Sequence, residues 1–212
     1  MPTISNVVQS LDVPSFLATL SQAAAAYCGD GERPHAQAVI AAMLEAEKAA
    51  KQQRLVYPLE ALLGDWRLCF TTLSKVNRQS PLTRKGIYVP KIAQAQISFS
   101  QPPGIEPISY SGKIGNQIQV GSILFRVTGP LHYPGKKNLL VFDFTQVQFS
   151  VFGKALYSGN FRSGAEAIAL EHRAISKLPF FTFFLVTENF IAARGRGGGL
   201  ALWVRSPQLK NH

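Results

Sequence analysis

Two segments constrain the fold of this chain most, because they lie at the two ends of its β-rich part. Residues 62–72 read Leu-Leu-Gly-Asp-Trp-Arg-Leu-Cys-Phe-Thr-Thr, a Gly-x-Trp start followed by strand-forming residues. Residues 187–205 contain two strand-like runs around the glycine-rich stretch 194–199. Glycine supplies the positive φ that tight hairpin turns need, so this stretch predicts a hairpin. An opening strand and a closing hairpin together predict a closed antiparallel barrel with a hydrophobic interior.

Alternating apolar residues predict the orientation of the opening strand and the position of others. The large apolar residues Trp66, Leu68 and Phe70 alternate with smaller or polar ones, so we expect them to share the inner face of the barrel. Residues 86–89 and 95–99 read as two further strands. The part that follows Gly64 is therefore predicted to be mainly β.

Two changes of alternation interrupt the longer strands. The large apolar residues change parity at 121–122 and again near 145–146. Each change predicts a β-bulge, which re-aims a strand as the closure of a small barrel requires. Residues 133–138 read as a loop between the two long strands, whereas residues 153–177 leave helix and strand open.

Residues 1–58 are predicted to be a helical extension of a barrel domain at 59–206, followed by a tail at 207–212. Capping signals place one helix from about residue 15 to 27 and another from 34 to 54.

The second helix is amphipathic, with Val39, Ile40, Met43 and Leu44 on one face. This face predicts packing against the outside of the barrel. A membrane-surface helix and a partner-docking helix are the alternatives, although the helix carries few basic residues for the first of them.

The net charge of +10 is concentrated in the barrel part of the chain. Residues 1–60 hold four Lys/Arg against six Asp/Glu, whereas residues 61–212 hold eighteen against six. Such a surface favours anionic partners: acidic lipid headgroups, nucleic acid or acidic proteins. The candidates for contact with acidic headgroups or an acidic partner, with a merely solvated surface as the alternative, are Arg78, Arg84, Lys85, Lys91, Lys136 and Lys137.

The sequence holds no pattern typical of a metal site or a catalytic centre. None of its four His and two Cys lies at metal-ligand spacing from another, and no nucleophile elbow or phosphate-binding loop occurs. Cys28 and Cys69 are expected to be two free, partly buried thiols in a reducing compartment, with one disulfide between them as the alternative. Asp143 has outward parity, which favours a solvated or arginine-paired carboxylate over proton transfer inside a cavity. We therefore expect no metal, no cofactor and no catalytic residue.

Two further segments each allow a structural and a functional interpretation. The single Arg-Gly-Arg-Gly-Gly-Gly copy at 194–199 favours a hairpin turn over nucleic-acid binding, because arginine- and glycine-rich binding segments work as repeats. Residues 180–184 contain four Phe, which predicts a strand covered on both faces or, alternatively, a barrel mouth or membrane-touching edge. The longest apolar stretch, 178–186, is shorter than the roughly 20 residues of a spanning helix, and no secretory signal pattern opens the chain. A soluble or peripheral protein is expected.

Three of these segments together resemble the plastid-lipid-associated proteins, also called plastid fibrillins. The resemblance is carried by residues 63–72, 86–88 and 187–195 leading into 198–202, and it extends over about 55–205. It implies a lipocalin-like barrel that binds prenylquinones, carotenoids or fatty acids. It also implies the cytoplasmic face of thylakoids or lipid droplets in a cyanobacterium, or a plastid in a eukaryote.

The resemblance also assigns roles to individual residues. By analogy with lipocalins, Trp66 closes the barrel through a cation–π contact with Arg194 or Arg205. The expected function is non-enzymatic carriage of a hydrophobic small molecule at photosynthetic membranes. The alternatives are a protein-interaction module with a filled barrel and a barrel enzyme that handles a tetrapyrrole or lipid. The residues expected to line the ligand are Leu68, Phe70, Phe125, Phe142, Phe144 and Phe149.

Overall fold

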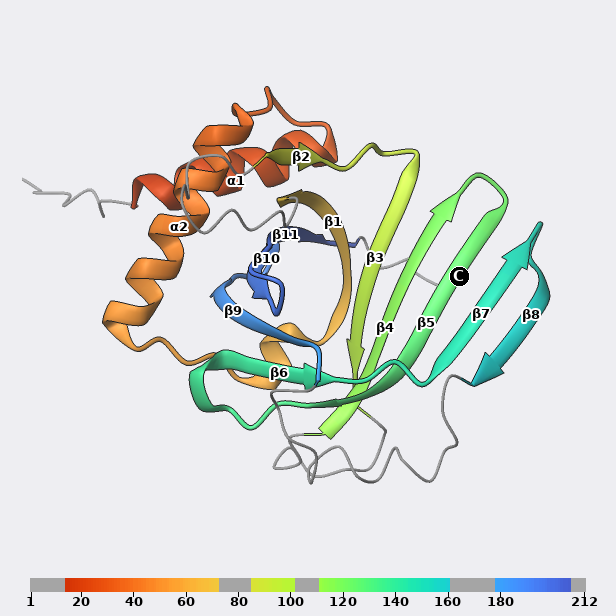
Figure 1. The fold of residues 1–212 in the computed structure, drawn as a ribbon. Helices are drawn as coiled ribbons and strands as arrows, with labels where there is room; N and C mark the ends of the chain where they lie inside the picture. The colour runs from red at the N-terminus through yellow and green to blue at the C-terminus, as the bar shows by residue number, and fades with distance from the viewer. Residues whose placement is uncertain (1–13, 73–84, 102–110, 161–177, 207–212) are drawn as a thin grey trace, which may run out of the picture.

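The computed structural model describes residues 14–72, 85–101, 111–160 and 178–206 (Figure 1). Two helices, α1 (Ser15–Cys28) and α2 (Ala36–Gln53), precede the strands in the described part of the chain. The strands are β1 (Gly64–Thr72), β2 (Gly86–Tyr88), β3 (Ala93–Ser100), β4 (Ser111–Val120), β5 (Ile123–His132), β6 (Leu139–Phe142), β7 (Gln146–Val151), β8 (Lys154–Asn160), β9 (Phe180–Val186), β10 (Phe190–Gly195) and β11 (Leu200–Arg205). The short 3-10 helices η1 (Leu59–Leu62) and η3 (Lys136–Asn138) precede β1 and β6.

Within the described residues, the strands form one sheet of eleven strands, all paired antiparallel. Eight of these described strands close a barrel in the order β1, β11, β10, β9, β6, β5, β4 and β3, since β3 pairs with β1 and β4 with β5. The helices lie outside it (Figure 1). The predicted fold class, a mainly β, lipocalin-like antiparallel barrel with N-terminal helices packed outside, is confirmed.

Strand β5 changes its partner along its length, and this makes part of the sheet leave the barrel. Its last residues, Leu131 and His132, pair with β6, whereas residues 123–128 pair with β7. Strand β7 in turn pairs with β8. The ends of β3, β4 and β5 together with β7 and β8 therefore form an extension, here called the open sheet (residues 93–96, 117–128, 146–151 and 154–160), at the right of Figure 1.

Gly129 stands where β5 changes partner. A Cβ at this position would lie 1.8 Å from the carbonyl oxygen of Asp143, in the segment that links β6 to β7. The amide nitrogen of Asp143 donates to the carbonyl oxygen of Pro130 at 3.2 Å, and that of Thr145 donates to Thr128 at 2.9 Å. Only glycine allows the two backbones to approach this closely.

The interior of the barrel is filled by large apolar side chains that come from all eight of its strands. Each of them is at most 5% exposed. Burial of each large side chain contributes about 1.5–3 kcal/mol, so this cluster is a main source of stability. Its members are Leu59, Leu62, Trp66, Ile97, Phe99, Ile114, Leu131, Tyr133, Leu140, Phe142, Phe183, Ile191, Ala193 and Trp203.

A second core lies between the outside of the barrel and the two helices. From the second helix it contains Val39, Ile40 and Met43, with Leu44 packed at its margin. From the barrel wall it contains outward-facing residues of β1, β9, β10 and β11. The predicted packing of the amphipathic helix against the barrel is thus confirmed. The left-handed Gly29, at φ 116°, ends α1 and turns the chain toward α2.

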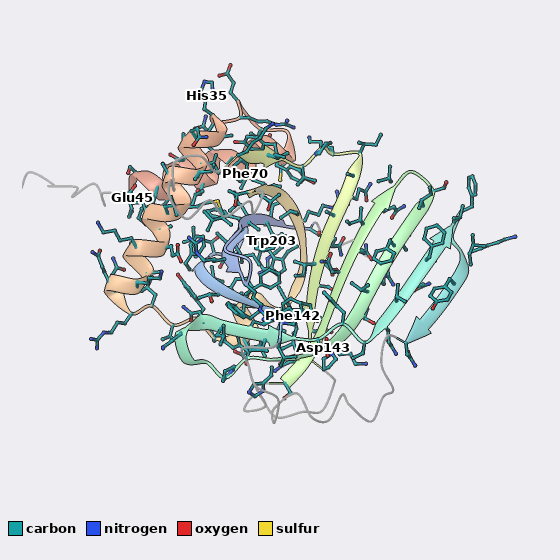
Figure 2. The ribbon with its side chains drawn as sticks, in the orientation of Figure 1. His35, Glu45, Phe70, Phe142, Asp143 and Trp203 are labelled. Carbon is teal, nitrogen blue, oxygen red and sulfur yellow. The ribbon has the colours of Figure 1, made fainter. Side chains whose placement is uncertain are left out.

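Phe70 belongs to this outer core, so its predicted inward orientation is wrong. The register of β1 against β11 shifts between Leu68 and Phe70, which marks a bulge. Leu68 pairs with the inward Trp203, whereas Phe70 pairs with the outward Leu202. Figure 2 shows Phe70 toward the helices and Trp203 inside the ring of strands. Strict alternation failed because one extra residue reverses the parity of everything after it.

At the two positions where bulges were predicted, the structure has a hairpin turn and a break between two strands. Gly121 and Ser122 form the two-residue loop of the β4–β5 hairpin, in which Val120 pairs with Ile123 and Gly121 adopts φ 58°. Residues 143–145 lie between β6 and β7, where the chain passes from the barrel to the open sheet. The parity changes were correctly located, but hydrophobic alternation cannot tell a bulge from a turn.

Strand β9 is covered on both faces, as predicted for its phenylalanine-rich sequence. Phe183 faces the barrel interior, and the neighbouring Phe184 faces the helices. Consecutive strand residues point to opposite faces, which gives this arrangement directly. The register against β10 shifts between Ala192 and Ala193, and this bulge puts Leu185 on the same outer side as Phe184. The predicted glycine hairpin joins β10 to β11, with Gly198 at φ 80°. Of residues 153–177, the first part forms β8 and 161–177 lie outside the described residues.

Candidate functional site

A groove of about 680 Å³ lies between the C-terminal half of α2 and the outer side of β6 and β9. We call it the α2–β9 groove. Its lining is mainly apolar, and its size is typical of small-molecule sites. The residues that line it are Glu47, Ala50, Lys51, Arg54, Leu55, Val56, Lys137, Asn138, Leu139, Phe180, Thr182, Phe183 and Phe184.

Apolar side chains on the groove are left accessible to solvent. In the segment that leaves α2, Leu55 is 39% exposed and Val56 is 65% exposed. Phe180 of β9 is half-buried and, like Leu139 of the neighbouring strand β6, packs against Val141 and Leu178. Contiguous apolar side chains that are exposed to solvent often mark a binding site, so the groove is a candidate site for an apolar ligand.

Hydrogen bonds to Asn138 hold two walls of the groove together. Its side chain accepts from the amide nitrogen of Tyr57 at 2.9 Å and donates to the carbonyl oxygen of Leu55 at 2.8 Å. The hydroxyl of Tyr133 donates to the carbonyl oxygen of Tyr57 at 2.8 Å. Burial raises the pKa of Tyr133 to about 12, so this hydroxyl keeps its proton at neutral pH. The groove is therefore held open by the fold itself.

Cationic side chains stand around this apolar groove. Lys51 and Arg54 come from the end of α2 and Lys137 from the β5–β6 loop. Lys51 donates to Glu47 at 3.0 Å, and its side chain remains 70% exposed. An ordinary interpretation of Lys51 is stabilisation of the helix C-terminus, which favours cations. The additional Arg54 and Lys137 give the rim a positive charge that this interpretation does not require.

Glu47, the acidic residue of the groove, is already paired. Its carboxylate accepts two hydrogen bonds from Arg194 and one from Lys51, and its side chain is 10% exposed. Burial is the largest influence on the pKa of Glu47 and acts to raise it, but the hydrogen bonds and charges of Arg194 and Lys51 outweigh it and lower the pKa. The carboxylate stays ionised and ties α2 to the β10–β11 hairpin.

Neither Cys28 nor Cys69 lines the groove. The described residues contain no cluster of three or more His, Cys, Asp or Glu that could hold a metal ion. Cys69 is buried, and burial raises the pKa of its thiol to about 12, so it is a poor nucleophile. Cys28 and Cys69 are both free thiols, as expected. In the described part of the chain, no helix has the length and apolar character to cross a bilayer.

The residues predicted to line a ligand are divided among three places. Phe142 lies in the filled interior, and Leu68 and Phe144 lie half-buried at its margin. Phe70 lies in the outer core. Phe125 and Phe149 lie side by side on the open sheet as a directly opposed pair. The structure therefore does not bring these six side chains into one cavity.

The predicted basic residues are also divided. Arg78 and Arg84 lie outside the described residues, as does the side chain of Lys136. Lys85 and Lys91 are exposed near β2 and β3. Lys137 lies at the groove, together with Lys51 and Arg54.

Trp66 meets one of its two proposed partners. The guanidinium of Arg205 lies over the Trp66 ring, 4.0 Å from its centroid. The indole nitrogen of Trp66 donates to the carbonyl oxygen of Leu62 at 2.7 Å, which fixes η1 beneath the ring. Arg194 instead binds Glu47 on the outside of the barrel.

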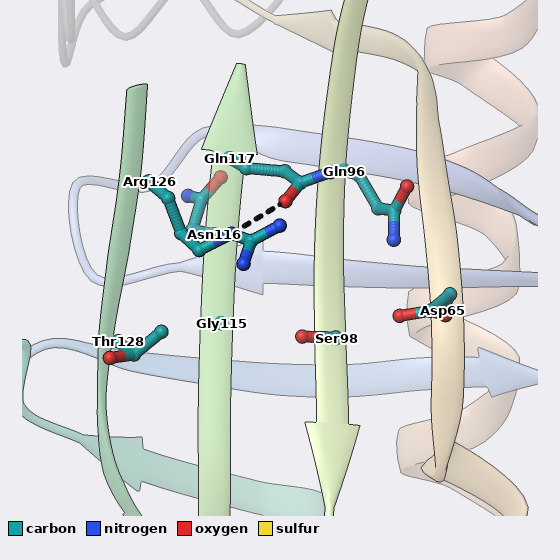
Figure 3. A pocket seen from close by; sticks show the side chains of 8 residues that line it. All are labelled: Asp65, Gln96, Ser98, Gly115, Asn116, Gln117, Arg126 and Thr128. Atoms are coloured by element: carbon teal, nitrogen blue, oxygen red, sulfur yellow. Dashed lines mark hydrogen bonds between the residues drawn. The ribbon is translucent and has the colours of Figure 1, made fainter. Parts of the chain in front are cut away.

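A second, polar hollow of about 300 Å³ is lined by residues of β1, β3, β4 and β5 (Figure 3). Arg126 donates to Gln117 at 2.9 Å across its upper side. Its centre is open because Gly115 has no side chain between Ser98 and Thr128. Asp65 lies directly opposite Ser98 at its edge.

Sequence reasoning missed the groove because its walls come from segments far apart in the chain. The signal nearest to it was the run of four Phe, whose outward members Phe180 and Phe184 form the floor. Comparisons with models of known families, with curated proteins and with solved structures give no match.

Proposed function

We propose that this protein is a non-enzymatic carrier of an anionic amphiphile, bound in the α2–β9 groove. The observation that carries the proposal is the combination of an apolar groove of about 680 Å³ with three cations at its rim. A barrel protein of this kind is compatible with a hydrophobic ligand.

The groove favours one of the expected cargo classes over the others. The carboxylate of a fatty acid or the phosphate of an acyl lipid would reach Lys51, Arg54 and Lys137 while the chain lies on Phe180 and Val56. A carotenoid or prenylquinone has no charge for these cations to bind. An acyl lipid is therefore the proposed cargo, and photosynthetic membranes or lipid droplets are the proposed location.

A second candidate function is a protein-interaction module, and the filled barrel interior supports it. A ligand inside the barrel would have to displace side chains that are at most 5% exposed. The carrier proposal consequently requires the cargo to bind outside the barrel, and failure of the groove to bind any amphiphile would favour the interaction module.

The test is titration of the full chain with oleate by isothermal calorimetry. The variant Lys51→Gln/Arg54→Gln/Lys137→Gln is expected to bind at least tenfold more weakly, since an exposed charge pair at about 4 Å is worth roughly 1 kcal/mol. The control Lys48→Gln/Lys85→Gln/Lys113→Gln removes the same charge from exposed positions away from the groove and is expected to bind like the parent. Absence of saturable binding by the parent, or equal weakening by both variants, contradicts the proposal.

A further inference from the structure

The open sheet has one apolar face that the described residues leave uncovered. Residues directly opposed in antiparallel strands share a face, so the register of five neighbouring strands defines rows on it. One row crosses β3, β4, β5, β7 and β8 and consists of Ala95, Ile118, Phe125, Phe149 and Tyr157. The row above it, nearer the hairpin tips, consists of Ala93, Val120, Ile123 and Val151.

These rows are exposed to an unusual degree for apolar side chains. Ile118 is 49% exposed, Phe125 43% and Tyr157 59%. A contiguous apolar face of this kind marks an interaction surface, whereas scattered single residues need no explanation.

The tips of the same strands project the most exposed apolar residues of the described chain. Ile92, before β3, is 73% exposed, and Phe152, in the β7–β8 turn, is 82% exposed. The pairings of Ala93 with Val120 and of Ile123 with Val151 place both tips at one edge of the sheet (Figure 1). The edge is thus a row of protruding apolar side chains.

Phe152 also adopts an unfavourable backbone conformation. It has φ 48° and is followed by Gly153 at φ 73°, the two positive angles for which two-residue hairpin loops prefer Asn-Gly. A bulky side chain in the left-handed region is strained, and such strain is typical of functional positions. The turn therefore holds an exposed phenyl ring where asparagine would be more stable.

The charge of this region selects the kind of partner. The sequences of β3, β4, β5, β7 and β8 contain no Asp or Glu. Lys91 and Lys154 flank the two protruding tips and are exposed. Asp65 and Asp143 lie at the barrel end of the sheet. Lys91 Nζ lies beside Gly29, 3.7 Å from where a Cβ of that residue would stand, so the following residue, Asp30, is the acidic residue near this lysine, whereas Lys154 lies at the far tip. Two copies of so basic an edge repel each other, whereas an anionic surface attracts it.

We propose that the hairpin edge of the open sheet docks onto an anionic lipid bilayer, with Phe152 and Ile92 inserted among the headgroups and Lys91 and Lys154 against lipid phosphates. Amphipathic surfaces bind bilayers through buried apolar area together with attraction to anionic lipids, and both features meet at this edge. The inference rests on the membrane-associated role proposed above but involves none of the groove residues. A carrier docked in this way would exchange cargo at the bilayer.

The test is co-sedimentation of the full chain with vesicles of phosphatidylcholine mixed with phosphatidylglycerol, against vesicles of phosphatidylcholine alone. The variant Ile92→Ser/Phe152→Asn is expected to lose at least tenfold in partitioning to the anionic vesicles, although Phe152→Asn alone raises the melting temperature. The variant Lys91→Gln/Lys154→Gln should lose about fivefold per lysine, which corresponds to about 1 kcal/mol each near an anionic surface.

The control Ile87→Ser removes an exposed apolar side chain from β2 and should leave partitioning unchanged. If the parent and the Ile92→Ser/Phe152→Asn variant sediment equally with the anionic vesicles, the docking proposal is wrong. A vesicle-independent dimer that Phe152→Asn dissociates also overturns it and assigns the face to a second copy. The parent protein separates the two proposals: vesicle docking without saturable oleate binding refutes only the carrier, and oleate binding without docking refutes only this inference.

Discussion

The closed barrel and the open sheet share strands β3, β4 and β5, yet the apolar residues of these strands are buried in the barrel and exposed on the open sheet. On one face of β4, Ile114 is 1% exposed inside the barrel, and Ile118, four residues later, is 49% exposed on the open sheet. On β5, Leu131 is 2% exposed and Phe125 is 43% exposed. The sequence alternates in the same way through both parts. Burial is therefore decided by the partner strands: β1, β6, β9, β10 and β11 close over one half, and none of the described strands closes over the other.

The largest expected effect is on the free energy of unfolding when one phenylalanine of each region is replaced by alanine. Phe99 is 2% exposed and contacts the Phe183 ring edge to face at 5.9 Å, so Phe99→Ala should lower the free energy of unfolding by about 3–5 kcal/mol. Phe125→Ala on the open sheet should cost less than about 1 kcal/mol. Urea denaturation followed by circular dichroism measures both, and equal losses would mean that the open sheet is covered in solution.

A single methyl group at Gly129, where β5 changes partner, should disturb the junction between the barrel and the open sheet. Gly129→Ala places a Cβ against the carbonyl oxygen of Asp143, and overpacking of this kind costs about 1–3 kcal/mol. Because the backbones of β5 and the β6–β7 link must separate, amide hydrogen exchange should accelerate in 143–151 while 190–205 stays protected. Uniform acceleration across the chain would show that the barrel and the open sheet are not separable units.

The outer face of the barrel, unlike the open sheet, is tied to its cover by a buried ion pair. Glu47→Gln should lower the free energy of unfolding by about 2 kcal/mol, since Arg194 then lacks its partner charge. The pKa of Glu47 is lowered in the folded protein, so its contribution is complete above its ordinary value of 4.5 and is lost as the pH falls through the lowered value. Denaturation at neutral and acidic pH should give a parent–variant difference that shrinks with acid, and a constant difference would contradict this role.

The smallest expected effect is an increase in stability, unlike the losses predicted for the other variants. Phe152→Asn should raise the free energy of unfolding by about 1 kcal/mol, because asparagine tolerates the left-handed turn conformation that strains phenylalanine. Thermal denaturation monitored by circular dichroism detects the gain, with Gly153 left unchanged. A loss of stability would show that the Phe152 ring packs against other residues in solution and is not exposed at the turn.

Local patterns predicted the barrel but not its limits. The Gly-x-Trp strand and the glycine hairpin at 194–199 fixed the closing strands, and the apolar face around Met43 fixed the position of α2. Phe70 was misplaced because a bulge reverses parity without any signal in composition. The partner change of β5 depends on its separate pairings with β6 and β7, and on the pairing of β6 with β9, which no local pattern encodes.

The candidate site was less accessible to sequence reasoning than the fold. Its cations come from α2 and from the β5–β6 loop, and its floor comes from β9. Lys51 and Lys137 are separated by most of the barrel in sequence and meet only after it closes. The expected ligand residues were divided among three places for a related reason, since alternation marks inward residues but cannot tell a filled barrel from a hollow one.

Photo-crosslinking distinguishes a cargo bound in the α2–β9 groove from a cargo bound inside the barrel. The full chain is mixed with an equimolar long-chain fatty acid that carries a diazirine near its methyl end, without vesicles, then irradiated, and the adducts are mapped by mass spectrometry. We expect adducts in 54–56 and 180–184, and their loss in Lys51→Gln/Arg54→Gln/Lys137→Gln. Adducts on interior residues such as Phe99 or Ile114, or the same adducts in that variant, would contradict it.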